Sequence, residues 1–338
     1  MTLSVADVFM RAWMRRGLLA SALWPASLLF RMLTTLRRRL YKIGVLRSTR
    51  LPVPVVVVGN VFVGGTGKTP FVIWLVEELR RAGHVPGVVS RGYGVRNKAP
   101  AMVTSATAPA SVGDEPALIA RRARCPVMVG RNRVAAARAL LAAHPEINLI
   151  VSDDGLQHYA LQRDVEIVLC DDRGNGNGWL LPAGPLREPA SRPRDFTVVN
   201  GGRFATGQLQ MFGMQLIGDV AERLCDRSQS IALRAISPSL CVAAAAGIGN
   251  PGRFFIMLRN AGLSIDEIAL PDHYDFSVNP FAGIRADMIL ITEKDAVKCS
   301  QIDTIKNDPR LWVVPVTARI DGALAERIVE KCRGRPTA

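Results

Sequence analysis

The sequence predicts an α/β protein whose core is a mostly parallel sheet with helices on its faces. Short apolar runs alternate with segments of helical periodicity between residues 51 and 200, which is typical of parallel strands joined by crossover helices. The first apolar run, residues 54–58, leads into a glycine-rich turn that ends in Gly67-Lys68-Thr69. A buried strand, a glycine-rich turn and a helix in this order are typical of the P-loop NTPase fold.

Length and composition allow more than one folding unit. A chain of 338 residues with 49% hydrophobic and 21% charged residues is globular rather than disordered. We expect amphipathic N-terminal helices at 1–50, a P-loop core at 51–200, and a smaller C-terminal α/β subdomain at 201–338 that closes over the site. The six cysteines show no C-x-x-C spacing, which fits a reducing compartment and predicts no structural zinc. Cys170 and Cys241 lie in apolar runs and are expected to be buried thiols.

The first 50 residues hold most of the net charge. They contain ten Lys and Arg against one acid, Asp7, which is +9 of the chain's +14. An apolar run that begins at Leu18 is interrupted by Pro25 and Arg31 before it reaches membrane-spanning length. Two short amphipathic helices are therefore expected instead of a cleaved signal. Their apolar faces consist of Val5, Phe9 and Trp13 in the first helix and Leu29, Met32, Leu33, Leu36 and Leu40 in the second.

Apolar stripes flanked by arginines and tryptophans are typical of helices that lie in the headgroup region of an anionic membrane. The same stripes could instead pack against the protein's own core, and a basic chain could bind nucleic acid. Nucleic-acid binding predicts basic residues interleaved with aromatic ones for stacking, whereas here they are interleaved with leucines. We expect a phospholipid surface as partner and no nucleic acid, with core packing as the alternative.

The glycine-rich turn predicts a nucleotide-binding site. Its backbone N–H groups can point at phosphate oxygens, at the positive end of the following helix. Lys68 would reach the β- and γ-phosphates, and Thr69 would ligate Mg²⁺. Phe62 stands where the strict pattern has glycine, and Val63 stands where one ATPase class has an extra lysine. The residues expected to hold ATP in this turn are Gly64, Gly65, Thr66, Gly67, Lys68 and Thr69.

The other elements follow from periodicity and from turn residues. A proline- and arginine-rich segment at 172–194 interrupts the alternation and is expected to be a functional loop. Residues 205–240 are poorly patterned, which allows an antiparallel excursion. Strands are expected at 53–58, 85–90, 127–129, 148–152, 165–170, 196–199, 240–245, 288–292 and 311–316, and helices at 68–82, 115–124 and 133–143.

Two acids follow the apolar run at 147–151, namely Asp153 and Asp154. In a parallel sheet, carboxylates at this position lie beside the phosphate loop, where Mg²⁺ binds. Gln157 and His158 keep further polar groups at the same edge. The alternative is an aspartate that caps the next turn.

Asp114 lies in a Gly-Asp-Glu-Pro turn at the start of an expected helix. It could cap that helix or act as a general base directed at the nucleotide, and spacing alone favours the cap. His273 lies between Asp272 and Asp275, either of which could hold its tautomer. A histidine in such a turn could equally be structural or solvated.

Several loop residues are candidates for binding phosphate, sugar or metal. Arg187 suits phosphate recognition, and Glu188 beside it could support a metal or an amine. Tyr93 and Arg133 follow expected strands, where either could contact a sugar or a phosphate. The polar run at 292–295 also follows a strand, but surface charge explains it equally well.

Taken in order along the chain, seven motifs resemble those of the tetraacyldisaccharide 4'-kinase family. The resemblance extends from about residue 5 to residue 330, and Tyr274 departs from it where many members have a second histidine. The motifs are Val63-Gly64-Gly65-Thr66-Gly67-Lys68-Thr69-Pro70, Ser90-Arg91-Gly92-Tyr93-Gly94, Gly113-Asp114-Glu115-Pro116, Asp153-Asp154-Gly155-Leu156-Gln157-His158, Leu181-Pro182-Ala183-Gly184-Pro185-Leu186-Arg187-Glu188, Asp272-His273 and Thr292-Glu293-Lys294-Asp295-Ala296-Val297-Lys298.

This resemblance implies a kinase associated with the cytoplasmic face of the inner membrane through its N-terminal helices. Such a kinase transfers the γ-phosphate of ATP to the 4'-hydroxyl of tetraacyldisaccharide 1-phosphate, giving lipid IVA in lipid A biosynthesis. The resemblance also implies that Asp114 is the base and that His273 is paired with it. The implied site adds Lys68 and Asp154 in catalysis, Arg187 on the nucleotide, Thr69, Asp153 and Glu188 on Mg²⁺, and Tyr93, Arg133, Gln157 and His158 on the substrate.

Two other classes of P-loop protein are the alternatives. A nucleic-acid-dependent ATPase would explain the basic composition and would be stimulated by DNA or RNA. A P-loop switch or partitioning ATPase would normally use an extra catalytic lysine or an Asn-Lys-x-Asp element, and neither occurs in the sequence. The sequence does not indicate an oligomeric state.

Overall fold

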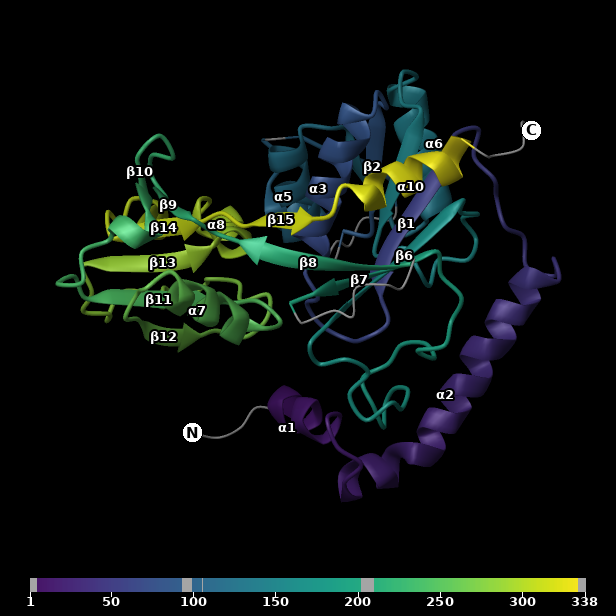
Figure 1. The fold of residues 1–338 in the computed structure, drawn as a ribbon, viewed down its shortest axis with the longest axis horizontal. Coiled ribbons are helices and arrows are strands. Elements are labelled where there is room, and N and C mark those ends of the chain that lie inside the picture. The colour runs from purple at the N-terminus through teal and green to yellow at the C-terminus, as the bar shows by residue number, and fades with distance from the viewer. Residues whose placement is uncertain (1–4, 93–98, 105, 202–209, 334–338) are drawn as a thin grey trace.

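The computed structural model describes residues 5–92, 99–104, 106–201 and 210–333, and the strands in this part of the chain form two sheets. The larger sheet has nine strands in the order β15-β8-β7-β6-β1-β5-β2-β4-β3, and the smaller has six in the order β10-β9-β14-β13-β11-β12. Each sheet is the centre of one lobe, and Figure 1 shows the lobes side by side with the first two helices beneath the larger one. The predicted α/β architecture is confirmed.

The larger sheet is parallel except at its two edges. Every residue of its central strand is buried, because helices cover both faces, and this explains a continuous apolar run where a half-exposed strand would alternate. The parallel strands are β1 (Val55–Asn60), β2 (Pro86–Ser90), β4 (Val127–Val129), β5 (Leu149–Asp153), β6 (Val165–Asp171), β7 (Phe196–Asn200) and β8 (Met211–Ile217), and the antiparallel edges are β3 (Ala101–Val103) and β15 (Thr317–Ile320).

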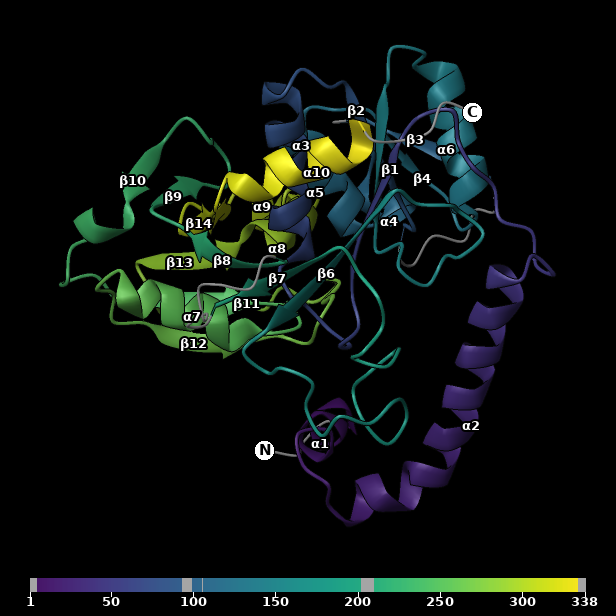
Figure 2. The same cartoon turned by 45° about the vertical axis from the view of Figure 1, so that its right-hand side comes forward.

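Two apolar clusters lie on opposite faces of this sheet. On one face α3, α5 and α10 bury side chains such as Phe71, Ile119 and Ile328, and on the other α6 buries Leu140 together with Leu156. The view in Figure 2 separates α6 from the helices of the opposite face. The helices of this lobe are α3 (Lys68–Arg81), α4 (Pro109–Val112), α5 (Asp114–Ala123), α6 (Arg133–Ala143) and α10 (Ala323–Arg333).

The second lobe repeats the layered arrangement on a smaller scale. Its sheet packs against α7 on one face and against α8 and α9 on the other, with Phe255 buried in the first cluster and Cys299 and Ile305 in the second. The elements are β9 (Val220–Arg223), β10 (Ser230–Ala232), the 3₁₀ turn η1 (Leu233–Ala235), β11 (Val242–Ala246), α7 (Pro251–Asn260), β12 (Asp266–Ala269), β13 (Met288–Thr292), α8 (Glu293–Cys299), α9 (Asp303–Lys306) and β14 (Leu311–Val314).

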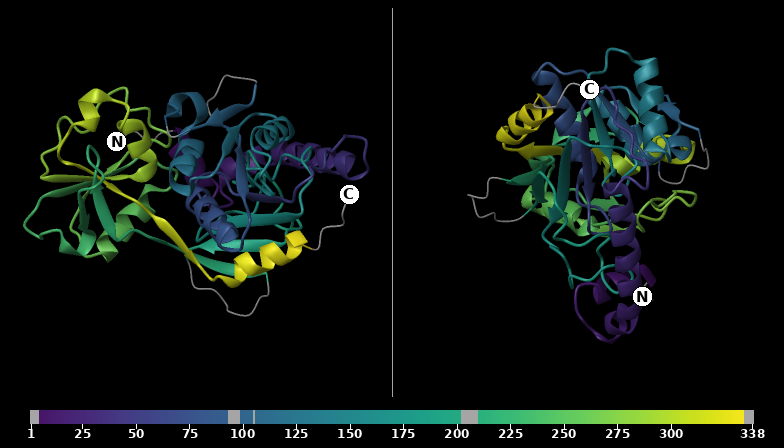
Figure 3. Two further views of the ribbon diagram at one scale, coloured as in Figure 1. Left: turned by 90° about the horizontal axis from the view of Figure 1, so that it is seen from above. Right: turned by 90° about the vertical axis from the view of Figure 1, so that its right-hand side faces the viewer.

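The chain passes twice between the lobes. It leaves the larger sheet at the end of β8 and returns to it with β15, and these two strands pair antiparallel with Ile217 opposite Thr317. Figure 3 shows the C-terminal strand and helix back on the larger lobe. This pairing differs from a simple division at residue 201, because β8, β15 and α10 belong to the larger lobe and the second lobe comprises residues 218–316.

The N-terminal segment differs from the sequence-based expectation. The structure contains α1 (Val5–Ala12) and a continuous helix α2 (Leu18–Lys42) of 25 residues, and Pro25 lies inside that helix without ending it. Tertiary contacts to the loop after β6 offset the backbone hydrogen bond that proline removes. The Ser27 hydroxyl donates to the carbonyl of Leu180 over 2.8 Å, and Trp24 contacts Trp179 at 6.4 Å between ring centroids.

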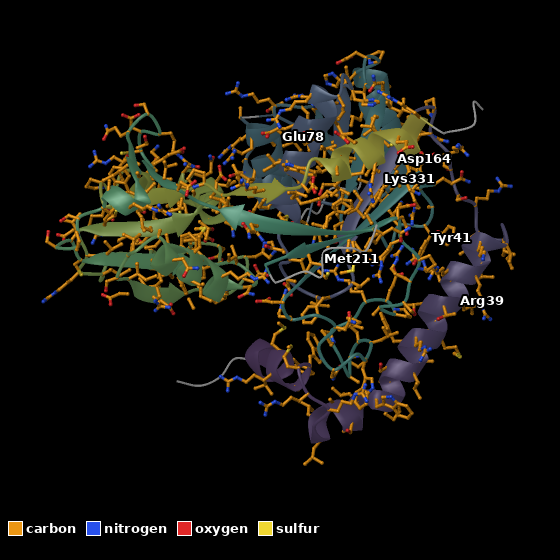
Figure 4. All side chains as sticks on the ribbon, viewed as in Figure 1. Arg39, Tyr41, Glu78, Asp164, Met211 and Lys331 are labelled. Atoms are coloured by element: carbon orange, nitrogen blue, oxygen red, sulfur yellow. The ribbon has the colours of Figure 1, made fainter. Side chains whose placement is uncertain are left out.

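The apolar stripe of α2 is exposed, which contradicts the alternative that it packs against the protein's own core. Leu29, Met32, Leu33 and Leu36 each expose half or more of their surface. By length and composition alone, α2 is also apolar enough to cross a membrane. Figure 4 labels Arg39 and Tyr41 at the C-terminal end of α2, where Arg39 is exposed and the ring of Tyr41 lies 5.9 Å from that of Tyr159.

Two further expectations are corrected. Cys241 is exposed because it precedes β11 rather than lying within the strand, and Cys170 is only partly buried. Strands β3, β8, β9, β10, β12 and β15 were not expected individually, although the region 205–240 does contain the antiparallel pair of β9 and β10.

Candidate active site

A cavity of about 2150 Å³ lies between the lobes. It is bounded by the phosphate loop, the starts of α5 and α6, the end of β5, the helices α7 and α8 of the second lobe, and one side of α2. Most of the residues expected to form the site line this cavity, although Tyr93 lies outside the described residues. Those that line it are Gly64, Gly65, Thr66, Gly67, Lys68, Thr69, Asp114, Arg133, Asp153, Asp154, Gln157, His158, Arg187, Glu188 and His273.

The phosphate loop joins β1 to α3, and two of its glycines are required by backbone conformation. Gly64 and Gly67 have φ of 101° and 89°, which a residue with a Cβ rarely adopts. Two asparagines that the sequence analysis missed brace the loop. The Asn60 side chain donates to the Gly64 carbonyl over 2.9 Å and accepts from Lys68 Nζ over 2.9 Å, and the Asn200 side chain donates to the Thr66 carbonyl over 3.1 Å.

Phe62 has a structural role where the strict motif has glycine. Its side chain is buried, and the Arg173 guanidinium lies 4.4 Å from its ring centroid. Arg173 Nη2 also donates to the Gly65 carbonyl over 2.8 Å, and Asp171 binds the same guanidinium. The Phe62 ring therefore positions Arg173, which in turn stabilises the phosphate loop through its hydrogen bond to Gly65.

The two acids at the end of β5 have different surroundings. Asp153 is buried, and its Oδ2 accepts from the Ser90 hydroxyl over 2.9 Å. Burial first, then the charges of Glu115 and Asp154, raise the pKa of Asp153 to about 7. Within the described residues its Oδ1 has no hydrogen-bond partner. A buried carboxylate oxygen without a partner, on a residue that lines the same cavity as the glycine-rich turn, fits a metal ligand.

Asp154 is paired with two cations. Its Oδ1 lies 3.6 Å from Lys68 Nζ and 3.2 Å from Arg187 Nη1. Burial acts to raise the pKa of Asp154, but Lys68 and Arg187 outweigh it and hold that pKa below its usual value. Its φ of 47° turns the chain sharply after β5. Asp154 therefore holds Lys68 and Arg187 next to each other at the wall of the cavity.

Asp114 does not cap the helix that it begins. The residue before it, Gly113, has the N-cap position, and Asp114 is the first residue of α5. Its Oδ2 lies 3.3 Å from His273 Nδ1 and 3.0 Å from Lys298 Nζ. Burial acts to raise the pKa of Asp114, but His273 and Lys298 outweigh it and lower that pKa. The carboxylate is thus ionised at neutral pH and available as a base.

The structure brings His273 to Asp114 across the lobe interface, while the acids beside it in sequence have partners of their own. Asp275 accepts from the backbone and hydroxyl of Ser277, and Asp272 lies 3.8 Å from Lys294. His273 has φ of 60°, and its N–H donates to the Gly247 carbonyl over 3.2 Å. This turn directs the imidazole at the other lobe.

A polar wall extends from the phosphate loop towards α2. The Arg133 side chain is buried, and its Nη1 donates to the Gly130 carbonyl over 2.9 Å. Burial lowers the pKa of Arg133 to about 10. Burial and neighbouring arginines lower the pKa of His158 to about 4, so this imidazole is neutral and accepts from the Arg133 backbone N–H over 3.3 Å. Gln157 lines the cavity beside them.

Glu188 is buried in the same wall, and only one of its two carboxylate oxygens is paired, because Oε1 has no hydrogen-bond partner among the described residues. Its Oε2 accepts from the Tyr159 hydroxyl over 2.7 Å and lies 3.0 Å from Arg192 Nη1. Its role in metal binding stays a prediction. Across the part of the chain that the structure describes, no cluster of three or more His, Cys, Asp or Glu side chains could hold a metal ion by itself, so a metal here would also need ligands such as Thr69 and phosphate oxygens.

The polar run at 292–295 is not surface charge, which corrects the simpler interpretation. It begins α8, whose first turn is buried between the lobes. Glu293 accepts from Arg122 over 2.8 Å, and Asp295 accepts from Thr292 and from the Gly247 N–H. Lys294 and Lys298 on this helix line the cavity, and neither was expected from the sequence as a site residue.

Comparisons with known proteins agree with this geometry. The family model described as tetraacyldisaccharide-1-P 4'-kinase matches residues 19–333. Two curated relatives, both called tetraacyldisaccharide 4'-kinase, are from Janthinobacterium sp. (strain Marseille) and Herminiimonas arsenicoxydans. They are 62% and 58% identical to this chain, and each alignment covers 99% of this chain and 98% of the relative.

A solved structure extends the similarity to three dimensions. The crystal structure of LpxK from Aquifex aeolicus in complex with ATP superimposes with a TM-score of 0.76 and 28% identity, covering 93% of this chain and 99% of the other. The family match and the relatives span nearly the whole chain and both lobes. The chain therefore belongs to the tetraacyldisaccharide-1-P 4'-kinase family.

Proposed function

We propose that this protein transfers the γ-phosphate of ATP to the 4'-hydroxyl of tetraacyldisaccharide 1-phosphate, which gives lipid IVA in lipid A biosynthesis. One observation carries the assignment of roles. The Asp114–His273 pair and the phosphate loop line the same cavity, so a base and a phosphate donor face one space. Relatives that align with nearly the whole chain have the name of this kinase.

ATP binds through the phosphate loop, and the related Aquifex structure, which is a complex with ATP, supports this assignment. Backbone N–H groups at the start of α3 bind phosphate oxygens, and Lys68 and Arg187 neutralise charge on the transferred group. The residues that would hold Mg²⁺ are Thr69 and Asp153, with Glu188 as a further candidate, and the ion would supply charge neutralisation at the β- and γ-phosphates. The partnerless oxygen of Asp153, counted over the described residues, supports its place among these ligands.

Asp114 is the general base. A sugar hydroxyl is a poor nucleophile, so its proton must be removed during attack on the γ-phosphorus. Asp114 is held ionised by His273 and Lys298, and His273 orients it across the lobe interface. In the transfer, the hydroxyl oxygen forms the new bond to phosphorus, the bond to ADP breaks, and the hydroxyl proton passes to Asp114.

The lipid substrate enters from the side of α2. Phe30, Thr34 and Arg37 of this helix line the same cavity as the phosphate loop, which makes a path from the exposed apolar stripe to the site. Arg133, Gln157, His158 and Tyr93 are proposed to contact the sugar and its phosphate. The stripe and the arginines at 37–39 support peripheral attachment to an anionic phospholipid surface, on the cytoplasmic face of the inner membrane.

The test is label transfer from γ-phosphate-labelled ATP to tetraacyldisaccharide 1-phosphate in mixed detergent micelles. Asp114→Asn should lower turnover by about 10²–10⁴-fold, the usual contribution of a positioned base, while nucleotide affinity measured by fluorescence stays close to that of the unaltered protein. Asp266→Asn, at an exposed position on β12, is the matched control and should keep full activity.

Two outcomes would overturn the proposal in different ways. A large loss of ATP affinity in Asp114→Asn, with normal turnover at saturating ATP, would remove Asp114 from the role of base. No transfer to the lipid by the unaltered protein, combined with ATP hydrolysis stimulated by DNA or by vesicles alone, would indicate a different P-loop ATPase.

A further inference from the structure

Helix α8 reaches from the second lobe to the start of α5 with two lysines. Lys294 and Lys298 are four residues apart and therefore lie on one face of the helix. Both side chains are largely buried, with 17% and 13% of their surface exposed. Buried ammonium groups are costly unless they are paired, so their partners indicate what they do.

Lys298 is fixed in front of Asp114. Its Nζ lies 3.0 Å from Asp114 Oδ2, donates to the Tyr274 carbonyl over 2.6 Å, and lies 5.8 Å from the ring centroid of Phe276. The aromatic face and the carbonyl hold the ammonium group in place from its own lobe. The Lys298 ammonium group of the second lobe therefore lies within hydrogen-bond distance of the Asp114 carboxylate of the first lobe.

Lys294 specifies the tautomer of His273. Its Nζ lies 3.4 Å from His273 Nε2 and 3.2 Å from Glu115 Oε1. Burial acts to lower the pKa of Lys294, but Glu115 and Asp272 outweigh it and raise that pKa, so the group is charged. An ammonium group has only donors, which makes Nε2 an acceptor. The ring proton is then on Nδ1, which faces Asp114 at 3.3 Å.

We propose that Lys294 and Lys298 are positioning residues: Lys298 holds the Asp114 carboxylate, and Lys294 holds the His273 ring with its Nδ1–H directed at that carboxylate. This inference rests on the proposed role of Asp114 as the base. In this proposal the role of α8 is to position the Asp114–His273 pair before each turnover. Because α8 belongs to the second lobe and Asp114 to the first, the base is prepared only where the lobes are in contact.

The charges around Asp114 determine in which direction its pKa moves when Lys298 is removed. The charged and titratable groups that act on it are His273 from the loop before β13 and Lys298 and Lys294 from α8, and Lys294 is shared with Glu115, the next residue of α5. Burial acts to raise the pKa of the Asp114 carboxyl, and the cations outweigh burial. Without Lys298 the pKa of Asp114 rises, so the base is protonated over a wider range of acidic pH.

The test is the pH dependence of kcat/KM for the lipid acceptor, measured from about pH 4 to about pH 8 so that it reaches the range in which a carboxyl group titrates. In Lys298→Met the acidic limb should move to higher pH by about 1 unit or more, as expected when an opposite charge within hydrogen-bond distance is removed. Activity at the acidic end then falls several-fold more than at the neutral plateau. Lys298→Arg keeps the charge and should return the limb towards its original position.

Controls separate this effect from general damage. Lys306→Met removes a lysine of the same lobe that pairs only locally, with Asp303 among the described residues, and should leave the pH profile unchanged. A loss of the same factor at every pH in Lys298→Met, with an unmoved acidic limb, would overturn the proposal. Asp114→Asn serves as the separate check on the base itself: if it retains activity, the proposed function of Asp114 fails whatever the result for Lys298.

The tautomer can be read directly by ¹⁵N NMR of histidine-labelled full-length protein. The chain has four histidines, so His273→Gln identifies the resonances of His273. We expect a protonated Nδ1 and an unprotonated Nε2 in the unaltered protein and a mixture of tautomers in Lys294→Met. A protonated Nε2 in the unaltered protein, or the same single tautomer in the variant, would contradict the role of Lys294.

Discussion

Asp153 and Asp154 are adjacent in sequence, yet the fold gives them opposite electrostatic surroundings. Asp153 is buried at the end of β5, where its carboxylate accepts from the Ser90 hydroxyl and the charges of Glu115 and Asp154 outweigh that of Lys68, whereas Asp154 pairs directly with Lys68 and Arg187. The difference follows from the alternation of side chains at a strand end. One acid is therefore poised to gain a cation, and the other is already balanced.

This difference predicts how the metal-free protein responds to pH. The pKa of Asp153 is raised from 3.8 to about 7, so the folded state binds the proton more tightly than the unfolded chain. Its contribution to stability is present below the unfolded pKa and lost as pH rises through about 7. With chelator present, Tm should fall between about pH 5 and about pH 8, and Asp153→Asn should remove that part of the fall. An unchanged slope in the variant would contradict the burial argument.

Arg187 gives a second prediction at this scale. Its guanidinium pairs with Asp154 at the phosphate end of the cavity, so Arg187→Met should raise KM for ATP by about 10–100-fold, the usual cost of a hydrogen bond to a charged group. Arg319→Met, which removes an exposed arginine of β15, is the control. Steady-state kinetics with varied ATP measure the effect, and an equal loss in both variants would point to general destabilisation.

Some of these residues could be predicted from the sequence and others could not, because local pattern identifies a motif but not its distant partners. The phosphate loop and Asp153 follow directly from a strand and the residues after it, so local pattern is enough to find them. Asp114 and His273 are separated by 159 positions, and only the resemblance to a family joined them in advance. Lys298 had no local signal, because its partner lies on the other lobe.

At the scale of elements, α2 shows how contacts override a local rule. Proline normally ends a helix, but the loop after β6 contacts α2 on both sides of Pro25, at Trp24 and at Ser27, and the helix continues. The buried parallel strands were predictable because each is a continuous apolar run. The short edge strands β3, β10 and β12 were not, because few of their residues are buried and their pattern has no period.

The exposed stripe of α2 predicts the strength of membrane attachment. Leu33→Glu should weaken binding to vesicles that contain anionic lipid by about tenfold or more. The substitution removes apolar surface that the membrane would bury and adds a negative charge on the side of α2 that faces the lipid. Val278→Glu, at an exposed apolar position of the second lobe, should leave binding unchanged. Vesicle flotation measures both, and equal binding of the two variants would refute attachment through this stripe.

At the scale of the whole molecule, the site exists only where two lobes meet. The second lobe contributes His273, Lys294 and Lys298 to the surroundings of Asp114, the proposed base, which belongs to the first lobe. The lobes also touch at the phosphate loop itself, where a Cβ on Gly249 would lie 2.8 Å from the backbone nitrogen of Gly65. Arg253 adds an ion pair with Asp172 at the same contact.

This close approach predicts a defect in catalysis without a defect in folding. Gly249→Val should separate the lobes at the phosphate loop, which raises KM for ATP and lowers kcat, while Tm changes little because each lobe keeps its own core. Gly283→Val, where nothing lies within 4 Å of the added Cβ, is the matched control. Kinetics and thermal unfolding of both variants check the prediction, and normal activity in Gly249→Val would show that the contact is dispensable.

The return of the chain in β15 has a consequence for biosynthesis. Ile217 and Thr317 are paired neighbours, so the second lobe occupies the tip of what would otherwise be a β-hairpin. While a ribosome is still making that lobe, β8 remains an open sheet edge and α3 lacks the cover of α10. The nucleotide-binding lobe is thus the first to begin folding and the last to finish, and a nascent chain released before β15 emerges would present a long unpaired edge to aggregation.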